Sequence, residues 1–335
     1  IIILTRAGLN LDLDDLKKIG RPAVMMCFVP ACCEILGTIL LAPRIFNVSY
    51  VEAAVMGSVL AAVSPAVVVP RMIKIMDEGY GQKRKIPQLI LAGAAADDVF
   101  VIVMFTSFSA RLSENRNTSR NISVSSFTQI PVSIISGIAV GALAGFLAEK
   151  WFVTVNMKPA IKVIILLSIS FVFVFVQNVE KIVPFSGLLA IMAMGMSLMH
   201  FNGKEAKELA GKYNELWSGA EILLFALVGA EVEISYAVNA GLAAVMLVFL
   251  ALIFRMCGVF LCTVKTVLKK KERLFCMVAY TPKATVQAAI GAVPLAMGLA
   301  CGKTVLTVAV LAILITAPLG AAVIDITYKK LLEKD

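Results

Sequence analysis

Two adjacent carboxylates, Asp97 and Asp98, stand in the middle of an otherwise apolar stretch, residues 86–105, that is long enough to cross a bilayer as a helix. A single ionised side chain at the centre of a spanning helix costs at least about 2.5–3.5 kcal/mol on insertion scales. The pair must therefore face water, a cation or a buried base. Consecutive helix residues point about 100° apart, so the two carboxylates cannot share one direction. We expect one to contact a protein base and the other a mobile ion.

The composition places the whole chain in a membrane. Of its 335 residues, 60% are hydrophobic and 16% are charged, and the mean hydropathy is +0.91. A soluble globular domain carries roughly 25% charged residues, so the sequence predicts an all-α, polytopic membrane protein. The expected spans are residues 22–42, 51–73, 87–109, 128–148, 160–178, 183–200, 217–232, 237–264, 274–299 and 303–325.

The first residues form an apolar run that is too short to span, and the chain does not begin with Met. We interpret residues 1–9 as the end of a helix whose start lies upstream, so that a truncated and inactive protein is one reading of this chain. At the other end, residues 326–335 are expected to form a cytoplasmic tail.

Lys and Arg gather in alternate loops, around residues 17–21, 71–85, 150–162, 204–212, 265–273 and 329–334. Loops rich in Lys and Arg stay on the cytoplasmic side, so this side, with the C-terminus, is predicted to be cytoplasmic, in the plasma membrane or an organelle membrane. The net charge of +9 is thus explained by topology, and no nucleic-acid partner is expected.

The sequence predicts no resident metal and no cofactor. The seven cysteines lie almost entirely in apolar runs and form no CxxC pair, and His200 is the single histidine. Small buried packing residues explain the cysteines better than metal ligation does.

Charged residues also occur inside other expected spans: Glu34, Arg255 and Lys283. Two spans are interrupted by proline, at Ser64-Pro65 and at Thr281-Pro282. Proline removes a backbone donor and disrupts the helix, and irregular backbone inside a membrane survives only where it is buried or lines a cavity. We expect both spans to be broken helices.

The order of these features repeats along the chain. A span with a buried charge precedes a broken span and then a third span, first around Glu34 and again around Arg255. The number of spans between the two sets places them in opposite orientation. Paired broken helices in inverted repeats indicate a transport site near the midplane. Lys283 is expected to offset the exposed carbonyl dipoles at the second break.

Several motifs resemble those of the NHA branch of the cation–proton antiporters. They are the Ser64–Pro70 stretch, Gly79-Tyr80-Gly81, Asp97-Asp98 and the string Pro282-Lys283-Ala284-Thr285-Val286-Gln287-Ala288-Ala289-Ile290-Gly291. The resemblance runs from Arg6 to Pro318, and the last string is highly specific.

The resemblance implies an inverted-repeat antiporter fold in which two broken helices cross at Pro65, Thr281, Pro282, Lys283 and Gln287. It implies a homodimer that works as an elevator, with about two helices of its dimerisation domain missing here. The core would comprise residues 10–127 and 233–325, and the dimerisation panel residues 128–232. Asp98 would be the principal binder of Na⁺, Li⁺ or H⁺, with Asp97 assisting it or engaging a base, and Arg255 would pair with Glu34.

Antiport by one site needs only that a cation and protons exclude each other. A carboxylate has to lose its proton before it coordinates Na⁺, and hard cations prefer oxygen ligands. Asp98, Asp97, the Ser64 hydroxyl and freed carbonyls are the expected ligands. Since an arginine effectively never deprotonates, Arg255 would carry no proton, and exchange is predicted to be electroneutral.

Two other functions would share part of this pattern. An intramembrane aspartyl protease needs two carboxyls that face each other from separate helices, which adjacent residues do not. A sodium-coupled organic solute symporter would also have crossed broken helices, but it needs donors for an organic anion, and the sequence offers no polar cluster beyond the acidic site.

Overall fold

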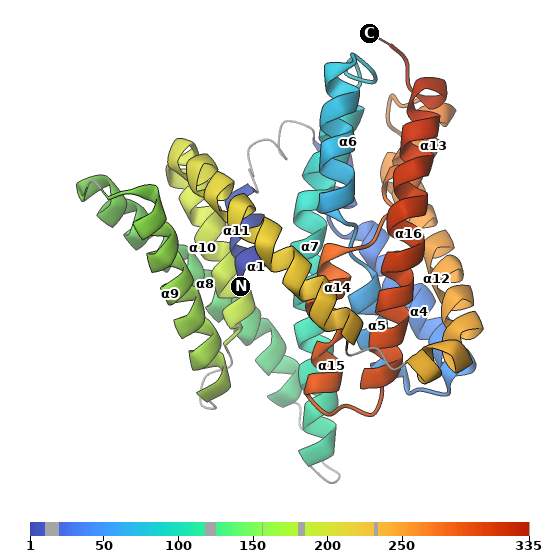
Figure 1. Cartoon of the computed structure of the whole chain (residues 1–335), viewed down its shortest axis with the longest axis horizontal. Helices are drawn as coiled ribbons and strands as arrows, with labels where there is room; N and C mark the ends of the chain where they lie inside the picture. The colour runs from blue at the N-terminus through green and yellow to red at the C-terminus, as the bar shows by residue number, and fades with distance from the viewer. Residues whose placement is uncertain (11–19, 118–124, 156, 180–184, 231–233, 335) are drawn as a thin grey trace. The chain divides into compact units, whose positions relative to one another are not determined.

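The computed structural model describes residues 1–10, 20–117, 125–155, 157–179, 185–230 and 234–334, and these are almost entirely helical (Figure 1). The first helices are α1 (Ile2–Asn10), α3 (Arg21–Met26), α4 (Val29–Phe46), α5 (Tyr50–Leu60), α6 (Pro65–Asp77), α7 (Ile86–Asn117) and α8 (Ser125–Thr154). The others are α9 (Pro159–Val179), α10 (Gly187–Phe201), α11 (Gly203–Ala230), α12 (Ile234–Thr263), α13 (Lys270–Ala279), α14 (Thr285–Gly291), α15 (Val293–Ala296) and α16 (Gly302–Leu331).

The described parts of the expected spans are helical except at short interruptions, of which residues 61–64 and 280–284 are the two expected breaks. Residues 183–184 and 231–232 of two spans lie outside the described part. Among the described residues, six helical segments are long and apolar enough to cross a membrane: Arg21–Phe46, Tyr50–Asp77, Ile135–Thr154, Pro159–Gln177, Gly241–Thr263 and Gly302–Leu331. The protein is a multi-pass membrane protein.

The structure corrects the expectation that residues 204–212 form a loop, because α11 begins at Gly203 and carries all three of its lysines. The side-chain oxygen of Asn202 accepts a hydrogen bond from the Glu205 N–H at 3.3 Å. Such a bond satisfies one of the free donors at the start of a helix, so the basic segment begins a helix instead of a turn.

The chain forms two compact units. Unit 1 comprises Ile1–Leu13 and Asn115–Leu223, and unit 2 comprises Asp14–Glu114 and Leu224–Asp335. Both units are therefore discontinuous in sequence. The division falls within α7 and α11, whereas the expected core and panel meet at residues 127/128 and 232/233. The second of these expected boundaries lies outside the described residues.

In unit 1, α8 packs against α10 along a row of glycines. Gly137, Gly141 and Gly145 are spaced by four residues, so they lie on one face of α8. A Cβ atom built at Gly141 would lie 2.2 Å from the Ala190 carbonyl oxygen and 2.7 Å from the Ala190 Cα. The two backbones thus approach so closely that only glycine fits, as is common where membrane helices associate.

In unit 2, α4 packs against α12 in the same manner. A Cβ atom at Gly258 of α12 would lie 2.7 Å from the Pro30 Cα, and one at Gly37 of α4 would lie 2.5 Å from the Phe254 ring. Around this pair, α5 and α6 form one interrupted rod, and α13, α14 and α15 form another (Figure 1). α6 and α13 lie towards one end of the unit, and α5 and α14 lie towards the other.

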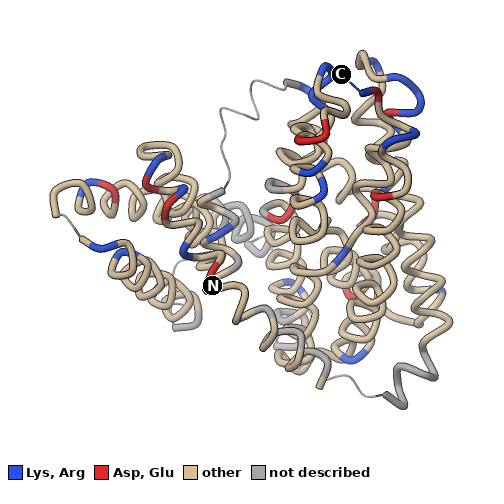
Figure 2. The backbone as a smooth tube through the Cα atoms, turned by 45° about the horizontal axis from the view of Figure 1, so that its top comes forward, with Lys and Arg blue, Asp and Glu red and all other residues tan. Residues whose placement is uncertain are grey.

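The end of unit 2 that holds the C-terminus is rich in Lys and Arg (Figure 2). Arg84 contacts Glu272 and lies 3.3 Å from Glu333. α16 continues to Leu331, which makes the first part of the expected tail helical. A hydrogen bond from the Tyr328 hydroxyl, at 2.7 Å, lowers the pKa of the Glu78 carboxyl below its ordinary value.

The close contact of α8 with α10 can be tested at Gly141. Gly141→Ala should lower the midpoint of thermal unfolding in detergent, because its methyl group overpacks the contact, at a cost of about 1–3 kcal/mol. Gly211→Ala is the matched control, because a Cβ at this exposed position of α11 meets nothing within 4 Å. It should leave the midpoint unchanged or raise it, since alanine favours helix by about 0.5–1 kcal/mol over glycine. Equal effects at both sites would contradict the packing.

Candidate functional site

The two breaks meet each other in the middle of unit 2. The first runs from Ala61 to Ser64, between α5 and α6, and the second from Tyr280 to Ala284, between α13 and α14. The Ser64 N–H donates a hydrogen bond to the Pro282 carbonyl at 2.8 Å, which joins the breaks directly. Pro65 occupies the first position of α6. A residue at this position has no hydrogen-bond acceptor for its N–H within the helix, so the absence of an N–H in proline costs nothing there.

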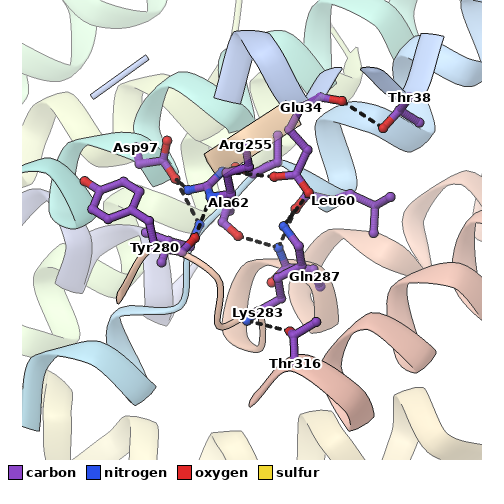
Figure 3. Close-up of polar contacts among 12 residues, drawn as sticks. Glu34, Thr38, Leu60, Ala62, Asp97, Arg255, Tyr280, Lys283, Gln287 and Thr316 are labelled. Carbon is purple, nitrogen blue, oxygen red and sulfur yellow. Dashed lines mark hydrogen bonds and ion pairs between the residues drawn. The ribbon is translucent and has the colours of Figure 1, made fainter. Parts of the chain in front are cut away.

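Arg255 of α12 lies at the centre of the crossing and is fully buried (Figure 3). Its Nη2 atom is 2.7 Å from Asp97 Oδ2, and its Nη1 atom is 3.1 Å from Glu34 Oε2. Its Nε atom donates to the Tyr280 carbonyl at 2.7 Å. Nη1 also donates to the Ala61 carbonyl. One guanidinium therefore links α4, α7 and both breaks.

Lys283 and Gln287 complete the crossing by pairing the carbonyl groups at the end of α5. Lys283 Nζ donates to the Leu60 carbonyl at 2.5 Å and lies 2.6 Å from Glu34 Oε1. Gln287 Nε2 donates to the Ala62 carbonyl at 2.8 Å and to that of Leu60 at 3.2 Å. The expectation that Lys283 offsets carbonyls of the second break was wrong, because its ammonium reaches those of the first.

Three carbonyls at the crossing already accept hydrogen bonds, whereas some carboxylate and hydroxyl oxygens there have no hydrogen-bond partner among the described residues. The carbonyls of Leu60, Ala61 and Ala62 all accept protein hydrogen bonds. Asp97 uses Oδ2 for Arg255 and for the Val63 N–H at 2.9 Å, while Oδ1 has no hydrogen-bond partner among the described residues. The buried Ser64 Oγ has none there either. Such oxygens suit a hard cation.

Asp98 follows Asp97 on α7 and is also buried, with an exposed fraction of 4%. The buried charges of the crossing are the acids Glu34, Asp97 and Asp98 and the bases Arg255 and Lys283. Among the described residues, three buried acids therefore face two buried bases at the crossing.

The structure places the other expected residue, Thr281, at the second break, but its hydroxyl bonds locally to the Val278 carbonyl at 2.8 Å. Sequence reasoning missed two further members of the crossing. Thr316 of α16 accepts a hydrogen bond from the Lys283 N–H at 3.0 Å, and Tyr280 supplies a carbonyl to Arg255. A threonine in the middle of an apolar span was a signal for the first, and an aromatic residue beside a break for the second.

Comparison with known proteins gives consistent matches over the whole chain. A family model described as "Sodium/hydrogen exchanger, transmembrane" matches residues 1–330. Sodium/hydrogen exchanger 9B2 of Homo sapiens is 33% identical over 345 residues, which cover 99% of this chain and 63% of that protein. Sodium/hydrogen exchanger 9B1 of Homo sapiens is 30% identical, over 99% of this chain and 65% of that protein. This chain thus spans less than two thirds of the length of these relatives.

A solved structure shares the fold. The sodium proton antiporter MjNhaP1 from Methanocaldococcus jannaschii superposes with a TM-score of 0.82 at 18% identity, over 98% of this chain and 83% of that chain. The architecture is accordingly the inverted-repeat antiporter fold with two crossed broken helices.

The contacts of Arg255 predict which second substitution restores the stability that is lost when Arg255 is replaced. Arg255→Leu strands the Asp97 carboxylate, whereas Glu34 keeps Lys283, and stranding a buried charge costs about 3–5 kcal/mol. Adding Asp97→Leu should therefore recover part of the lost thermal stability. Adding Glu34→Leu should not, because it strands Lys283 as well.

The exposed pair Lys212 and Glu215, 2.9 Å apart, provides the control. Lys212→Ala should change stability by less than about 1 kcal/mol. Equal recovery from the Asp97 and Glu34 substitutions would contradict the assignment of partners.

Proposed function

The chain belongs to the transmembrane sodium/hydrogen exchanger family, and from this premise we propose that it is a sodium (or lithium)/proton antiporter whose ion site is the Asp97–Asp98 pair. The observation that carries the proposal is that, among the described residues, three buried acids and two buried bases gather at a crossing of two broken helices. With all five ionised, one monovalent cation or one proton balances the excess acid. A site with this charge holds one Na⁺ or one H⁺ but not both, so each ligand displaces the other.

Asp98 is proposed as the principal ligand, because Arg255 already binds one oxygen of Asp97. Asp97 Oδ1, the Ser64 hydroxyl and water would complete the shell. When the cation leaves, Asp98 takes up a proton, and the protonated site returns to the side of the membrane from which the cation came. Arg255 and Lys283 hold the crossing together and fix the charge that the mobile ion must balance.

For the movement, we propose an elevator in which unit 2 is the mobile core, since it contains the whole crossing. Unit 1 is proposed as the dimerisation panel. Its helices α8 and α9 expose large apolar side chains, such as Ile135, Leu143, Ile164 and Phe171, which suit lipid or a second subunit. The basic end of unit 2 supports a cytoplasmic C-terminus (Figure 2).

The site assignment is tested by Asp98→Asn. The protein is reconstituted in vesicles, and a pH gradient is imposed across their membrane. Addition of Na⁺ or Li⁺ should then dissipate the gradient, and K⁺ is tested as the third cation. Asp98→Asn should abolish the response, because an amide cannot exchange a proton for a cation, and should leave the protein folded. Asp325→Asn, which changes an exposed carboxylate of α16, should retain full exchange.

Full transport by Asp98→Asn would overturn the site. A response that requires an organic anion as well as Na⁺ would favour the symporter instead. No response to any of the three cations would point to an inactive protein.

Charge balance also predicts the stoichiometry. Since Arg255 remains charged in both states and one cation replaces one proton, exchange should be electroneutral. The initial rate in vesicles should therefore be the same with and without a potassium diffusion potential set by valinomycin. A rate that rises or falls with that potential would mean that a second group, foremost Lys283, carries a proton through the cycle.

A further inference from the structure

One peptide unit of the first break, which joins Ala62 to Val63, is hydrogen-bonded at both of its ends. The Val63 N–H donates to Asp97 Oδ2 at 2.9 Å, and the Ala62 carbonyl accepts from Gln287 Nε2 at 2.8 Å. A trans peptide unit is planar, and its N–H and C=O point in opposite directions. The unit therefore connects Gln287 of α14 with Asp97 of α7, and Figure 3 shows Ala62 between these two residues.

The Ala62 carbonyl depends on Gln287 for its hydrogen bond. The Gln287 side chain is fully buried, and its Nε2 donates to the backbone oxygens of Ala62 and Leu60. The Leu60 carbonyl also accepts from Lys283, so it keeps a donor without Gln287. No other donor to the Ala62 carbonyl is found among the described residues. Loss of the Gln287 amide would thus leave a buried carbonyl unpaired, which is costly.

The second break holds the corresponding peptide unit in the same manner. Counted back from the first residue of the helix that follows each break, unit 62–63 corresponds to unit 282–283. The carbonyl of unit 282–283 accepts from the Ser64 N–H at 2.8 Å, and its N–H donates to Thr316 Oγ1 at 3.0 Å. The side-chain acceptor follows the N–H by 34 residues at the first break and by 33 at the second. Fixing this unit is therefore common to both repeats, but only at the first break is the acceptor an acid, Asp97.

We propose that Gln287 is a positioning residue, which holds the peptide unit of Ala62 and Val63 so that its N–H fixes Asp97 Oδ2 and leaves Oδ1 directed at the cation. The role of the cation rests on the proposed function. Arg255 donates to the same Oδ2 at 2.7 Å, while Oδ1 has no hydrogen-bond partner among the described residues. A carboxylate that is held at one oxygen from two sides presents its other oxygen in one direction. Binding then has less side-chain freedom to remove, which favours affinity.

Removal of the Gln287 amide should loosen Asp97 through the peptide unit. The unpaired carbonyl turns towards another donor, and the Val63 N–H turns with it, because one plane holds both groups. Asp97 then keeps its bond to Arg255 but loses the second contact that fixed its Oδ2. We therefore expect weaker binding of the cation, and no change in the movement of the loaded protein.

Gln287→Met tests the amide, because it keeps a side chain of similar length and removes both donated hydrogen bonds. In vesicles with an imposed pH gradient, the Na⁺ concentration that gives half the maximal rate should rise by about twofold to twelvefold, the equivalent of one hydrogen bond. The maximal rate should stay the same, since the lost interaction belongs to binding.

Gln177→Met is the matched control. The Gln177 side-chain oxygen accepts a hydrogen bond from the Gly187 N–H at 2.7 Å, in unit 1 and outside the crossing. The same substitution there removes a bond between a glutamine and the backbone without touching the first break. It should change neither the half-saturating Na⁺ concentration nor the maximal rate.

Gln287→Asn provides a second route if Gln287→Met does not fold, which thermal unfolding in detergent reports. It keeps a polar amide but shortens the side chain by one methylene, so the amide withdraws from the Ala62 carbonyl. The half-saturating Na⁺ concentration should rise in this variant as well. An unchanged value in the folded variants would overturn the role of Gln287. A lower value would also overturn it, because the freed carbonyl would then bind the cation itself.

Hydrogen exchange separates this inference from the proposed function. The Val63 N–H is protected by its bond to Asp97, and its exchange with deuterium does not depend on transport. Gln287→Met should speed deuterium uptake at Val63, and Gln177→Met should not. If the wild type transports no cation but this uptake still becomes faster, the antiporter is wrong and the positioning of Asp97 stands. Unchanged uptake at Val63 in folded Gln287→Met would overturn the positioning, whatever the transport.

Discussion

The guanidinium of Arg255 is the interaction on which the crossing depends, because it satisfies groups that the broken helices leave open. Breaking a helix inside a membrane exposes carbonyls that neither lipid nor the helix can pair. Arg255 pairs the Ala61 and Tyr280 carbonyls, one at each break, and balances Glu34 and Asp97 with the same charge. Its planar fork of five donors suits this better than a lysine ammonium would.

Lys283 plays the complementary part. It carries the second positive charge, pairs Glu34 and the Leu60 carbonyl, and in turn is held by Thr316 through its backbone N–H. With two bases committed to the scaffold, the fold fixes the charge that the proposed mobile ion would balance. The proposed site would then change its ligand without rearranging the protein charges around it.

Much of this arrangement could be predicted from the sequence, for definite physical reasons. A charged residue or a proline inside an apolar span costs free energy, so it stands there only for a reason. On this basis Asp97, Arg255, Pro65 and Pro282 could be singled out from the sequence. The partners of those residues were harder to predict. Which carbonyls Lys283 reaches depends on how the two breaks cross, and neither hydropathy nor spacing encodes that geometry.

Tyr280 could not be predicted as a member of the crossing, for a different reason. Its contribution is made by a carbonyl and a ring face, and neither has a distinctive sequence signature. The start of a helix such as α11 depends on local capping, here by Asn202. The lysines of this segment led to the expectation of a loop instead.

The crossing has a consequence for biosynthesis. Asp97 and the carbonyls at the end of α5 receive their partners from residues 158 to 227 positions later in the chain. At a synthesis rate of roughly 5–20 residues per second, the first half of the crossing waits on the order of ten to forty-five seconds for its bases. During that interval its acids and open carbonyls need water or a helper protein, and the nascent chain is most vulnerable to misassembly just before α12 and α13 arrive.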